Sequence, residues 1–156
     1  MMSALADEIK QSKPFASKEE EVFLNIQRTA EVLGWTMNEI LKPFELTRGQ
    51  YNVLRILRGA GEDGIKCSEV SERLITKDSD ITRLLDRLEN RGLVSRERDE
   101  KDRRIVISRI TDQGLEILEQ LDEPASQGIK RILGHLGEDL LEQLNALLVL
   151  ARANVK

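Results

Sequence analysis

Apolar residues recur at three- and four-residue steps through much of the chain, and this spacing predicts amphipathic helices. The first such stretch begins at Lys18 and stops at Pro43, because proline cannot continue a helix interior. Its apolar positions are Val22, Ile26, Ala30, Leu33, Met37, Ile40 and Leu41. Residues 1–17 are polar, contain Pro14 and keep no period, which predicts a flexible N-terminal arm or a short extra helix.

Hydroxyl residues mark the starts of the next helices, because a Ser or Thr side chain can accept a hydrogen bond from the first turn. Thr47 predicts a helix that ends in the glycine-rich segment 59–64. Ser68 predicts a short helix, SEVSERL, and Ser79 predicts a helix over about residues 80–91. The apolar stripe of this last helix consists of Ile81, Leu84, Leu85 and Leu88.

The pattern then changes to alternation. Gly92 stands where a helix takes its left-handed C-terminal residue. After it, LVSRER and RIVISRI alternate apolar and polar residues, which predicts two half-buried strands. The polar segment DEKDR between them suits a hairpin tip. The predicted order is therefore helix, short helix, turn, helix and two-stranded hairpin.

Two more helices follow the hairpin. Thr111 predicts the cap of a helix that continues or restarts after Pro124, until Gly134 and Gly137 break it. The last helix, from about Glu138, has leucines beyond a single stripe, at positions such as 141, 148 and 150. A wide apolar face of this kind indicates a partner helix. The alternative is a monomer that folds its terminal helices onto its own body.

A short helix, a tight turn and a second helix form a helix-turn-helix, whose second helix enters the major groove of DNA. The polar front of that helix consists of Ser79, Asp80, Thr82, Arg83 and Arg87. The hairpin tip carries Lys101, Arg103 and Arg104, which suit a narrow minor groove, and an Asp102–Arg104 ion pair would orient the arginine. The alternatives are an ordinary amphipathic helix with solvated arginines and a charged tip that keeps the strands soluble.

Charge and composition leave this interpretation open. The net charge is −4, but residues 73–109 hold 11 basic and 8 acidic residues, a local balance of +3. Phosphate attraction depends on such a local patch. The single cysteine, Cys67, cannot form an internal disulfide, and no membrane span or secretory signal is evident. These features predict a cytoplasmic protein.

The segment SEVSERLITKDSDITRLLDRLENRGLVSRERDEKDRRIVISRIT resembles the core of the MarR family of transcriptional regulators. The matching features are ITRLLDRLENRGLV, the D-x-R pair Asp102/Arg104, the T-x-x-G step at Thr111–Gly114 and the upstream LTRGQYNVLRIL. The resemblance covers roughly residues 20 to 153. It implies a mainly α fold with a small β-hairpin wing: a winged helix-turn-helix domain at 47–110, and a helical dimerisation region at 18–46 and 111–156.

The resemblance also implies a function: a sequence-specific regulator, expected to be a repressor, that binds a pseudo-palindromic operator in double-stranded DNA as a homodimer. Arg83 and the wing residue Arg104 match the family's DNA-binding arginines, with Asp102 as a brace and Arg103 as an added contact. Ser79, Asp80 and Thr82 lie where the family approaches bases and phosphates. The expected dimer interface includes Val22, Ile26, Leu140, Leu141, Leu144 and Leu148.

Many members of this family are released from DNA by small aromatic or phenolic compounds. Trp35, Met37 and Tyr51 are the candidates for such a cleft, with core or interface packing as the alternative. Some relatives sense oxidants through a cysteine near the start of the first long helix. Cys67 lies elsewhere, just before the predicted short helix, and both inert packing and reactivity stay open for it. With one histidine, His135, and one cysteine, the chain predicts no metal site and no cofactor.

Two other function classes are an enzyme and a protein-interaction module. An enzyme is not expected, because G-x-S-x-G, a glycine-rich phosphate loop and HExxH are all missing from the sequence. The alternative to a DNA-binding regulator is a winged-helix protein-interaction module without DNA binding. Such a module has no need of Arg83 or of a basic wing.

Overall fold

The computed structural model describes residues 3–76 and 80–155. The chain divides into two compact units, residues 1–36 and residues 37–156. Among the described residues no helix is both long and apolar enough to span a membrane.

The first unit contains helix α1 (Ala4–Glu8) and most of helix α2 (Lys18–Leu41). The Ser3 side chain caps α1 by accepting a hydrogen bond from the backbone N–H of Ala6. Arg28 of α2 forms an ion pair of 2.9 Å with Glu8. Of the two expectations for residues 1–17, a short extra helix is therefore present within that segment. As predicted, α2 ends immediately before the turn that contains Pro43.

Helix α3 (Arg48–Ala60) follows a short 3-10 turn, η1 (Lys42–Phe44). The predicted cap, Thr47, is confirmed, and it forms a capping box with Gln50. The Thr47 hydroxyl accepts from the Gln50 N–H at 3.2 Å, while the Gln50 side chain accepts from the Thr47 N–H at 3.0 Å. These reciprocal bonds satisfy two of the backbone donors that a helix start leaves without partners.

The helix-turn-helix consists of α4 (Cys67–Arg73) and α5 (Ile81–Asn90). Both predicted caps need correction. Helix α4 begins one residue before Ser68, with Lys66 as a cap that makes no side-chain bond. Helix α5 is capped by Asp80, whose carboxylate accepts from the Arg83 N–H at 3.1 Å, whereas Ser79 lies outside the described residues.

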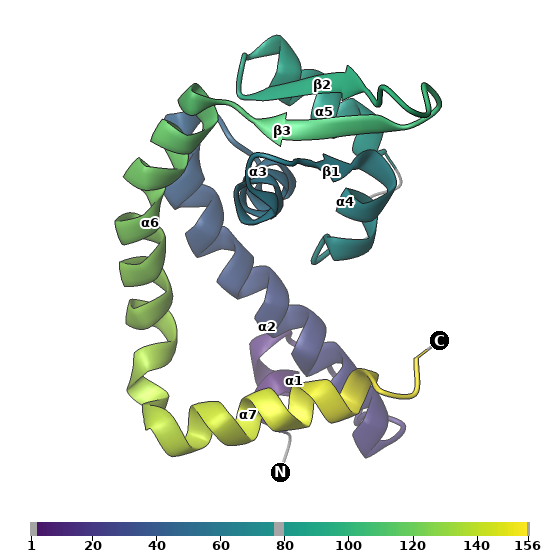
Figure 1. Ribbon diagram of the computed structural model, residues 1–156. Coiled ribbons are helices and arrows are strands. Elements are labelled where there is room, and N and C mark those ends of the chain that lie inside the picture. The colour runs from purple at the N-terminus through teal and green to yellow at the C-terminus, as the bar shows by residue number, and fades with distance from the viewer. Residues whose placement is uncertain (1–2, 77–79, 156) are drawn as a thin grey trace. The chain divides into compact units, whose positions relative to one another are not determined.

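The sheet has three strands rather than the two that were predicted. Strands β2 (Val94–Arg98) and β3 (Val106–Ile110) form the expected antiparallel hairpin, called the wing, and β1 (Ile65–Lys66) pairs with the other edge of β3. The third strand was missed because two residues are too short to show any alternation. Figure 1 shows the three strands lying side by side in the order β1-β3-β2.

Gly92 connects α5 to the wing, as predicted. Its φ of 70° lies in the left-handed region, which favours glycine. The N–H groups of Gly92 and Leu93 donate to the carbonyl oxygens of Glu89 and Leu88, at 2.8 and 3.0 Å. This is the double hydrogen bond of a Schellman ending, and it turns the chain directly from α5 into β2.

Helix α6 (Asp112–Leu133) starts at the predicted cap, Thr111, and runs without interruption through Pro124. The T-x-x-G step has a packing reason: a Cβ on Gly114 would overlap the carbonyl oxygen of Leu93 and lie 2.7 Å from Ile110 Cγ1. A second 3-10 turn, η2 (Gly134–Leu136), leads into the last helix, α7 (Gly137–Arg152).

The core of the second unit lies between the helices and the small sheet, with α3 packed against β3 and α5 against β2. Aliphatic side chains dominate it, in keeping with an aromatic content of 3%. Its fully buried members include Leu41, Val53, Leu54, Leu57, Val70, Leu85, Leu88, Leu93, Leu118 and Leu121. The predicted stripe of α5 is therefore divided: Leu85 and Leu88 are fully buried, while Ile81 and Leu84 lie at the margin.

Candidate nucleic-acid interface

Helix α5 presents a polar front opposite its buried leucines. Thr82, Arg83 and Arg87 are all exposed on it. The Arg83 side chain retains 69% of its accessible surface, and its guanidinium lies 3.8 Å from the Asp80 carboxylate. Asp80 thus both caps the helix and pairs with Arg83. Arg83 therefore pairs with Asp80 in the isolated chain, and its side chain is still exposed enough to contact a second molecule.

The wing tip is ordered by one acidic side chain. The Asp99 carboxylate accepts from the backbone N–H groups of Lys101 and Asp102, both at 2.9 Å. These two bonds lower the pKa of Asp99, and the bond from the Asp102 N–H has the larger effect. Two backbone bonds close the hairpin, from Asp99 to Ile105 at 3.0 Å and from Ile105 to Asp102 at 2.9 Å. Asp99 thus shapes the turn that displays the basic residues of the tip.

Asp102 acts on the backbone rather than on the Arg104 guanidinium. Its carboxylate accepts from the Arg104 N–H at 3.0 Å, and no Asp102–Arg104 ion pair occurs in the part of the chain described. The predicted ion pair is therefore wrong. In a tight turn, a carboxylate two residues before Arg104 reaches the Arg104 backbone N–H more readily than its guanidinium. Arg98 donates to the Arg103 carbonyl oxygen at 3.0 Å and adds a second brace.

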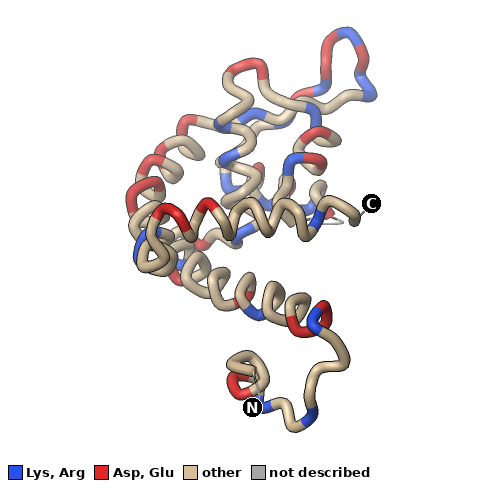
Figure 2. The backbone as a smooth tube through the Cα atoms, turned by 90° about the horizontal axis from the view of Figure 1, so that it is seen from below, with Lys and Arg blue, Asp and Glu red and all other residues tan. Residues whose placement is uncertain are grey.

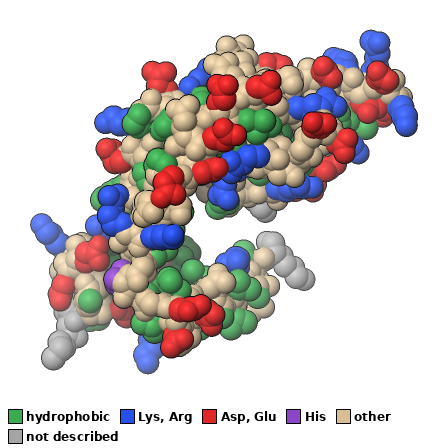
Figure 3. Space-filling model, turned by 60° about the vertical axis from the view of Figure 1, so that its left-hand side comes forward, with side chains coloured by type: hydrophobic (Ala, Val, Ile, Leu, Met, Phe, Trp, Pro, Cys, Tyr) green, Lys and Arg blue, Asp and Glu red, His purple; other side chains and the backbone are tan. Residues whose placement is uncertain are grey.

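The three basic residues of the tip, Lys101, Arg103 and Arg104, are all exposed. Figure 2 shows basic and acidic positions alternating around the end of the hairpin, at the upper right. In Figure 3 the same end carries blue side chains that reach outward beside red ones. The tip therefore presents exposed cations on a turn that acidic side chains hold through backbone hydrogen bonds.

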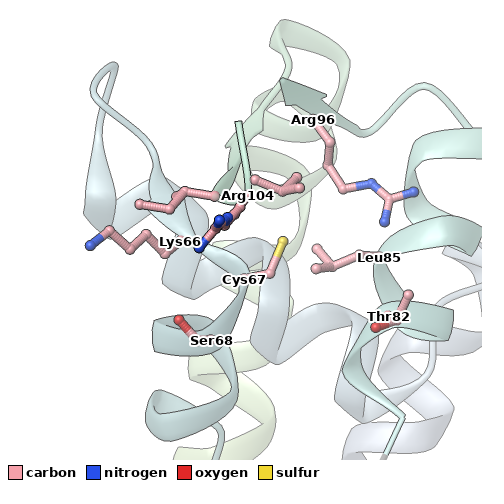
Figure 4. Close-up of a pocket in the computed structure, with 9 residues that line it drawn as sticks. Lys66, Cys67, Ser68, Thr82, Leu85, Arg96 and Arg104 are labelled. Carbon is pink, nitrogen blue, oxygen red and sulfur yellow. The ribbon is translucent and has the colours of Figure 1, made fainter. Parts of the chain in front are cut away.

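A hollow of about 330 Å³ lies between α5, the start of α4 and the wing. Its lining brings together Thr82 of α5 and Arg104 of the wing, with Lys66 and Ser68 at the start of α4. Figure 4 shows Arg104 and Thr82 on opposite sides of this space, with the Cys67 sulfur between them. Two elements predicted to contact DNA thus border one concave surface.

Cys67 is half-buried in this hollow, and its Sγ lies 3.3 Å from the Oγ of the fully buried Ser108. No group of three or more His, Cys, Asp or Glu side chains placed to hold a metal ion occurs among residues 3–76 and 80–155. The described residues thus give Cys67 a hydrogen-bonded contact with β3.

Two arginines that hold α5 in place were not identified from the sequence. Arg91, at its C-terminal end, donates to the carbonyl oxygens of Glu45 at 2.7 Å and Phe44 at 2.9 Å. Arg96 of β2 contacts the carboxylates of Asp86 and Glu89. The Arg91 contacts join segments distant in sequence, and the Arg96 contacts depend on how the wing folds back on α5, so no local spacing could have revealed them.

A larger cavity, of about 690 Å³, lies in the second unit between α3, α5 and α6. Met37 and Tyr51, two of the three residues predicted for a ligand cleft, line it. Three arginines line it as well, and one of them, Arg87, belongs to the front of α5; the other two are Arg48 and Arg55. Trp35 is not among the lining residues; it belongs to the first unit, where the Arg28 guanidinium lies 5.7 Å from its ring centre.

The residues predicted for a dimer interface are mostly exposed in the single chain. Val22 and Ile26 are exposed on α2, and Leu140, Leu144 and Leu148 on α7, while Leu141 is half-buried. Helix α7 has no buried residue at all. Its leucines contribute to the hydrophobic surface seen in Figure 3.

Comparison with known proteins gives a consistent result. Residues 46–106 match the model of the MarR family. The chain is 31% identical to the HTH-type transcriptional repressor IacR of Pseudomonas putida, over 89% of this chain and 82% of that protein. It is 41% identical to a MarR transcription factor of Planctomyces limnophilus, whose crystal structure aligns with a TM-score of 0.67 over 87% of this chain and 98% of the other.

A third likeness is to a mutant MarR from E. coli crystallised with operator DNA. The identity is 28% and the TM-score 0.76, covering 94% of this chain and 96% of that one.

Proposed function

This chain belongs to the MarR family of transcriptional regulators, and from that premise we propose that it is a repressor that binds a pseudo-palindromic DNA operator as a homodimer. Helix α5 enters the major groove, and the wing lies along the adjacent minor groove. Repression is proposed by analogy with the related repressor from Pseudomonas putida. A protein acting on chromosomal DNA in this way works in the cytoplasm.

One observation carries the proposal: helix α5 and the wing both carry exposed cations and border the same hollow, α5 through Thr82 and the wing through Arg104. Arg83 and Arg87 stand on the front of α5, and Arg104 lines the hollow between that helix and the wing. Arginine reads guanine O6 and N7 in the major groove and favours the negative potential of a narrow minor groove. Thr82 and Asp80 add a hydroxyl and a carboxylate that suit phosphate and cytosine contacts.

The same proposal assigns the chain to two functional regions. Residues 47–110 form the DNA-binding domain, and residues 18–46 and 111–156 form the dimerisation region. Support comes from α7, on which no residue is buried in the single chain although leucines and valine recur along it. Exposed apolar surface of this extent is costly in water, and a second copy of the chain removes it.

The deciding experiment is selection of preferred duplexes from a random DNA pool by the full-length protein. The expected outcome is an inverted repeat whose half-sites lie about one helical turn apart. Binding to this duplex should weaken steeply as salt increases, since each phosphate contact releases counterions. Failure to enrich any sequence, together with absent or salt-insensitive binding to random duplex, would favour a protein-interaction module.

We propose further that a small aromatic or phenolic effector binds the cavity lined by Met37 and Tyr51. The support is that Leu84 and Arg87 of α5 line the same cavity, so an occupant would touch the proposed recognition helix directly. The arginines Arg48 and Arg55 favour an effector that also carries a negative charge. Trp35 is assigned no part in this cavity.

The effector proposal is tested by adding aromatic carboxylates and phenols to the operator complex. A ligand of this site should release the DNA and raise the melting temperature of the free protein. Tyr51→Leu should reduce that response without changing operator affinity in the absence of ligand. Release that is equal in the variant and the parent would place the effector elsewhere.

A further inference from the structure

Arg96 lies in the middle of β2 and reaches across to helix α5. Its guanidinium contacts two carboxylates there, at 2.5 Å from Asp86 and 2.5 Å from Glu89, and its Nε donates to Glu89 at 3.0 Å. Only 20% of the Arg96 side chain is exposed. Hydrogen bonding to Glu89 and then Asp86 raises its pKa against the opposing effect of burial.

The two carboxylates stand three residues apart, on successive turns of the same flank of α5. A planar guanidinium that grips both fixes the rotation of the helix about its axis as well as its distance from the strand. Arg87, on the other flank, faces the larger cavity instead. Figure 4 shows the Arg96 guanidinium turned away from Arg104. Arg96 thus lines the same hollow as Arg104, but its guanidinium is bound to the carboxylates of α5.

The position of Arg96 along its strand gives this contact a mechanical consequence. Arg96 pairs with Ser108 of β3, which is fully buried, so the Arg96 backbone is anchored in the sheet. Two residues later, Arg98 supports the wing tip through the carbonyl oxygen of Arg103. One short strand thus carries both a grip on α5 and a brace of the tip.

We propose that Arg96 is a positioning residue for DNA recognition, which locks α5 to the wing at the angle that lets both engage one duplex. The inference rests on the proposed function. Arg96 need not touch DNA itself, because its effect passes through Arg83 on the helix and Arg104 on the wing. Without the lock, each element can still attract phosphate, but the two no longer reach their bases together.

A purely electrostatic role makes the opposite prediction. If Arg96 only neutralises Asp86 and Glu89 near DNA, removing the two negative charges should strengthen binding to every duplex. If Arg96 positions α5, removing them should weaken specific binding even though the protein becomes more positive. Substituting the two carboxylates therefore distinguishes the positioning role from the electrostatic role better than substituting Arg96 does.

The test is the double variant Asp86→Asn/Glu89→Gln, measured on the duplex that the parent selects from a random pool and on random duplex of equal length. Affinity for random duplex should stay the same or rise. Affinity for the selected duplex should fall, so that the ratio of the two decreases about 10- to 100-fold, the discrimination of one good base contact. A ratio equal to the parent's, or a gain on both duplexes, would overturn the positioning role.

A matched control changes the same charge at a distance. Glu116→Gln/Glu119→Gln removes two exposed carboxylates from α6 and should leave the ratio unchanged. Arg96→Lys keeps the positive charge but cannot grip two carboxylates at once. It should therefore reduce the ratio as well, by less than the double variant does.

Failure of the inference can be distinguished from failure of the proposed function. If the parent selects no duplex, the proposed function fails. If the parent selects one and the double variant keeps its ratio, only the inference fails. Melting temperature is measured for every variant. A loss of folding in both the double variant and Arg96→Lys would make Arg96 a determinant of stability and would also overturn the positioning role.

Discussion

Arg104 combines a fixed backbone with a free side chain. Its N–H is held by Asp102 at 3.0 Å, while the guanidinium, with no ion pair among the described residues, stays exposed. A long side chain on an ordered turn loses less freedom on binding than one on a mobile loop. This arrangement suits insertion into a groove.

Arg104→Ala should accordingly weaken binding to the selected duplex by about 1–3 kcal/mol, with little change in melting temperature. The affinity is measured by fluorescence anisotropy at fixed salt, and stability by thermal unfolding. Glu100→Ala is the matched control, because it truncates an exposed side chain of the same turn. Equal binding by Arg104→Ala and the parent would remove the wing from the mechanism.

Gly114 is required by close packing rather than by its backbone angles. Any Cβ there would overlap the Leu93 carbonyl oxygen, which also accepts from the Thr111 N–H at 3.1 Å. Because the obstructing atom belongs to a paired backbone, it cannot move aside like a side chain. Gly114→Ala should lower the free energy of unfolding by about 1–3 kcal/mol, measured by urea denaturation.

Gly59→Ala is the matched control for that substitution. Gly59 is exposed on α3, and nothing lies within 4 Å of the position that a Cβ would occupy. Alanine favours a helix over glycine by roughly 1 kcal/mol, so this variant should be at least as stable as the parent. Equal losses in both variants would show that the close approach at Gly114 has no energetic weight.

At the scale of elements, the ion pair between Arg58 and Asp122 joins α3 to α6. It is bidentate, with distances of 2.8 and 3.0 Å, and both side chains are partly exposed. Hydrogen bonding to Arg58 lowers the pKa of Asp122. A carboxyl whose pKa is lower in the folded state stabilises the fold above its ordinary pKa of about 3.9, and that contribution is lost as pH falls through the folded value.

Asp122→Asn should therefore destabilise the protein at neutral pH by no more than about 1 kcal/mol, because the pair is screened by solvent. The difference from the parent should shrink as pH falls below the ordinary carboxyl pKa of about 3.9 and through the lower pKa of the folded state, where the parent carboxylate also becomes protonated. Urea denaturation at matched protein concentration measures it. A difference that stays constant with pH would mean that lost packing, not lost charge, is the cause.

The long elements were predictable because their signals are local. Thr47 and Thr111 cap their helices as expected, and Gly92 ends α5 in the left-handed region. The missed strand, β1, depends instead on pairing across the chain. Strand β1 exists only because Ile65 pairs with Ser108, a residue more than 40 positions away.

The same distinction applies to the candidate site. The spacing along α5 identified Thr82, Arg83 and Arg87 as its polar front, because helical periodicity alone decides which residues share a face. It could not identify Arg96, because its carboxylate partners depend on how the wing folds back over the helix. The Asp102–Arg104 ion pair failed for a local reason: in a tight turn a carboxylate reaches a backbone N–H before a long side chain.

At the scale of the whole molecule, α7 is the element that the single chain leaves unfinished. This helix contains no buried residue, and Leu147 and Leu150 retain 63% and 68% of their accessible surface. Helices of this length are rarely stable without tertiary packing of an apolar face. A second copy of the chain would supply that packing, and it would also place two copies of α5 on one duplex.

Leu144 lies at the centre of this exposed face, so Leu144→Glu tests whether the face is an interface. A charge buried between helices is strongly unfavourable, so the variant should dissociate or unfold at concentrations where the parent is a dimer. Sedimentation velocity measures the oligomeric state, and thermal unfolding at several protein concentrations measures stability. Glu142→Gln, on the same helix, should leave both unchanged. If Leu144→Glu keeps the parent's sedimentation coefficient and melting temperature, α7 is not the dimer interface, and the proposed spacing of two recognition helices on one operator must depend on another part of the chain.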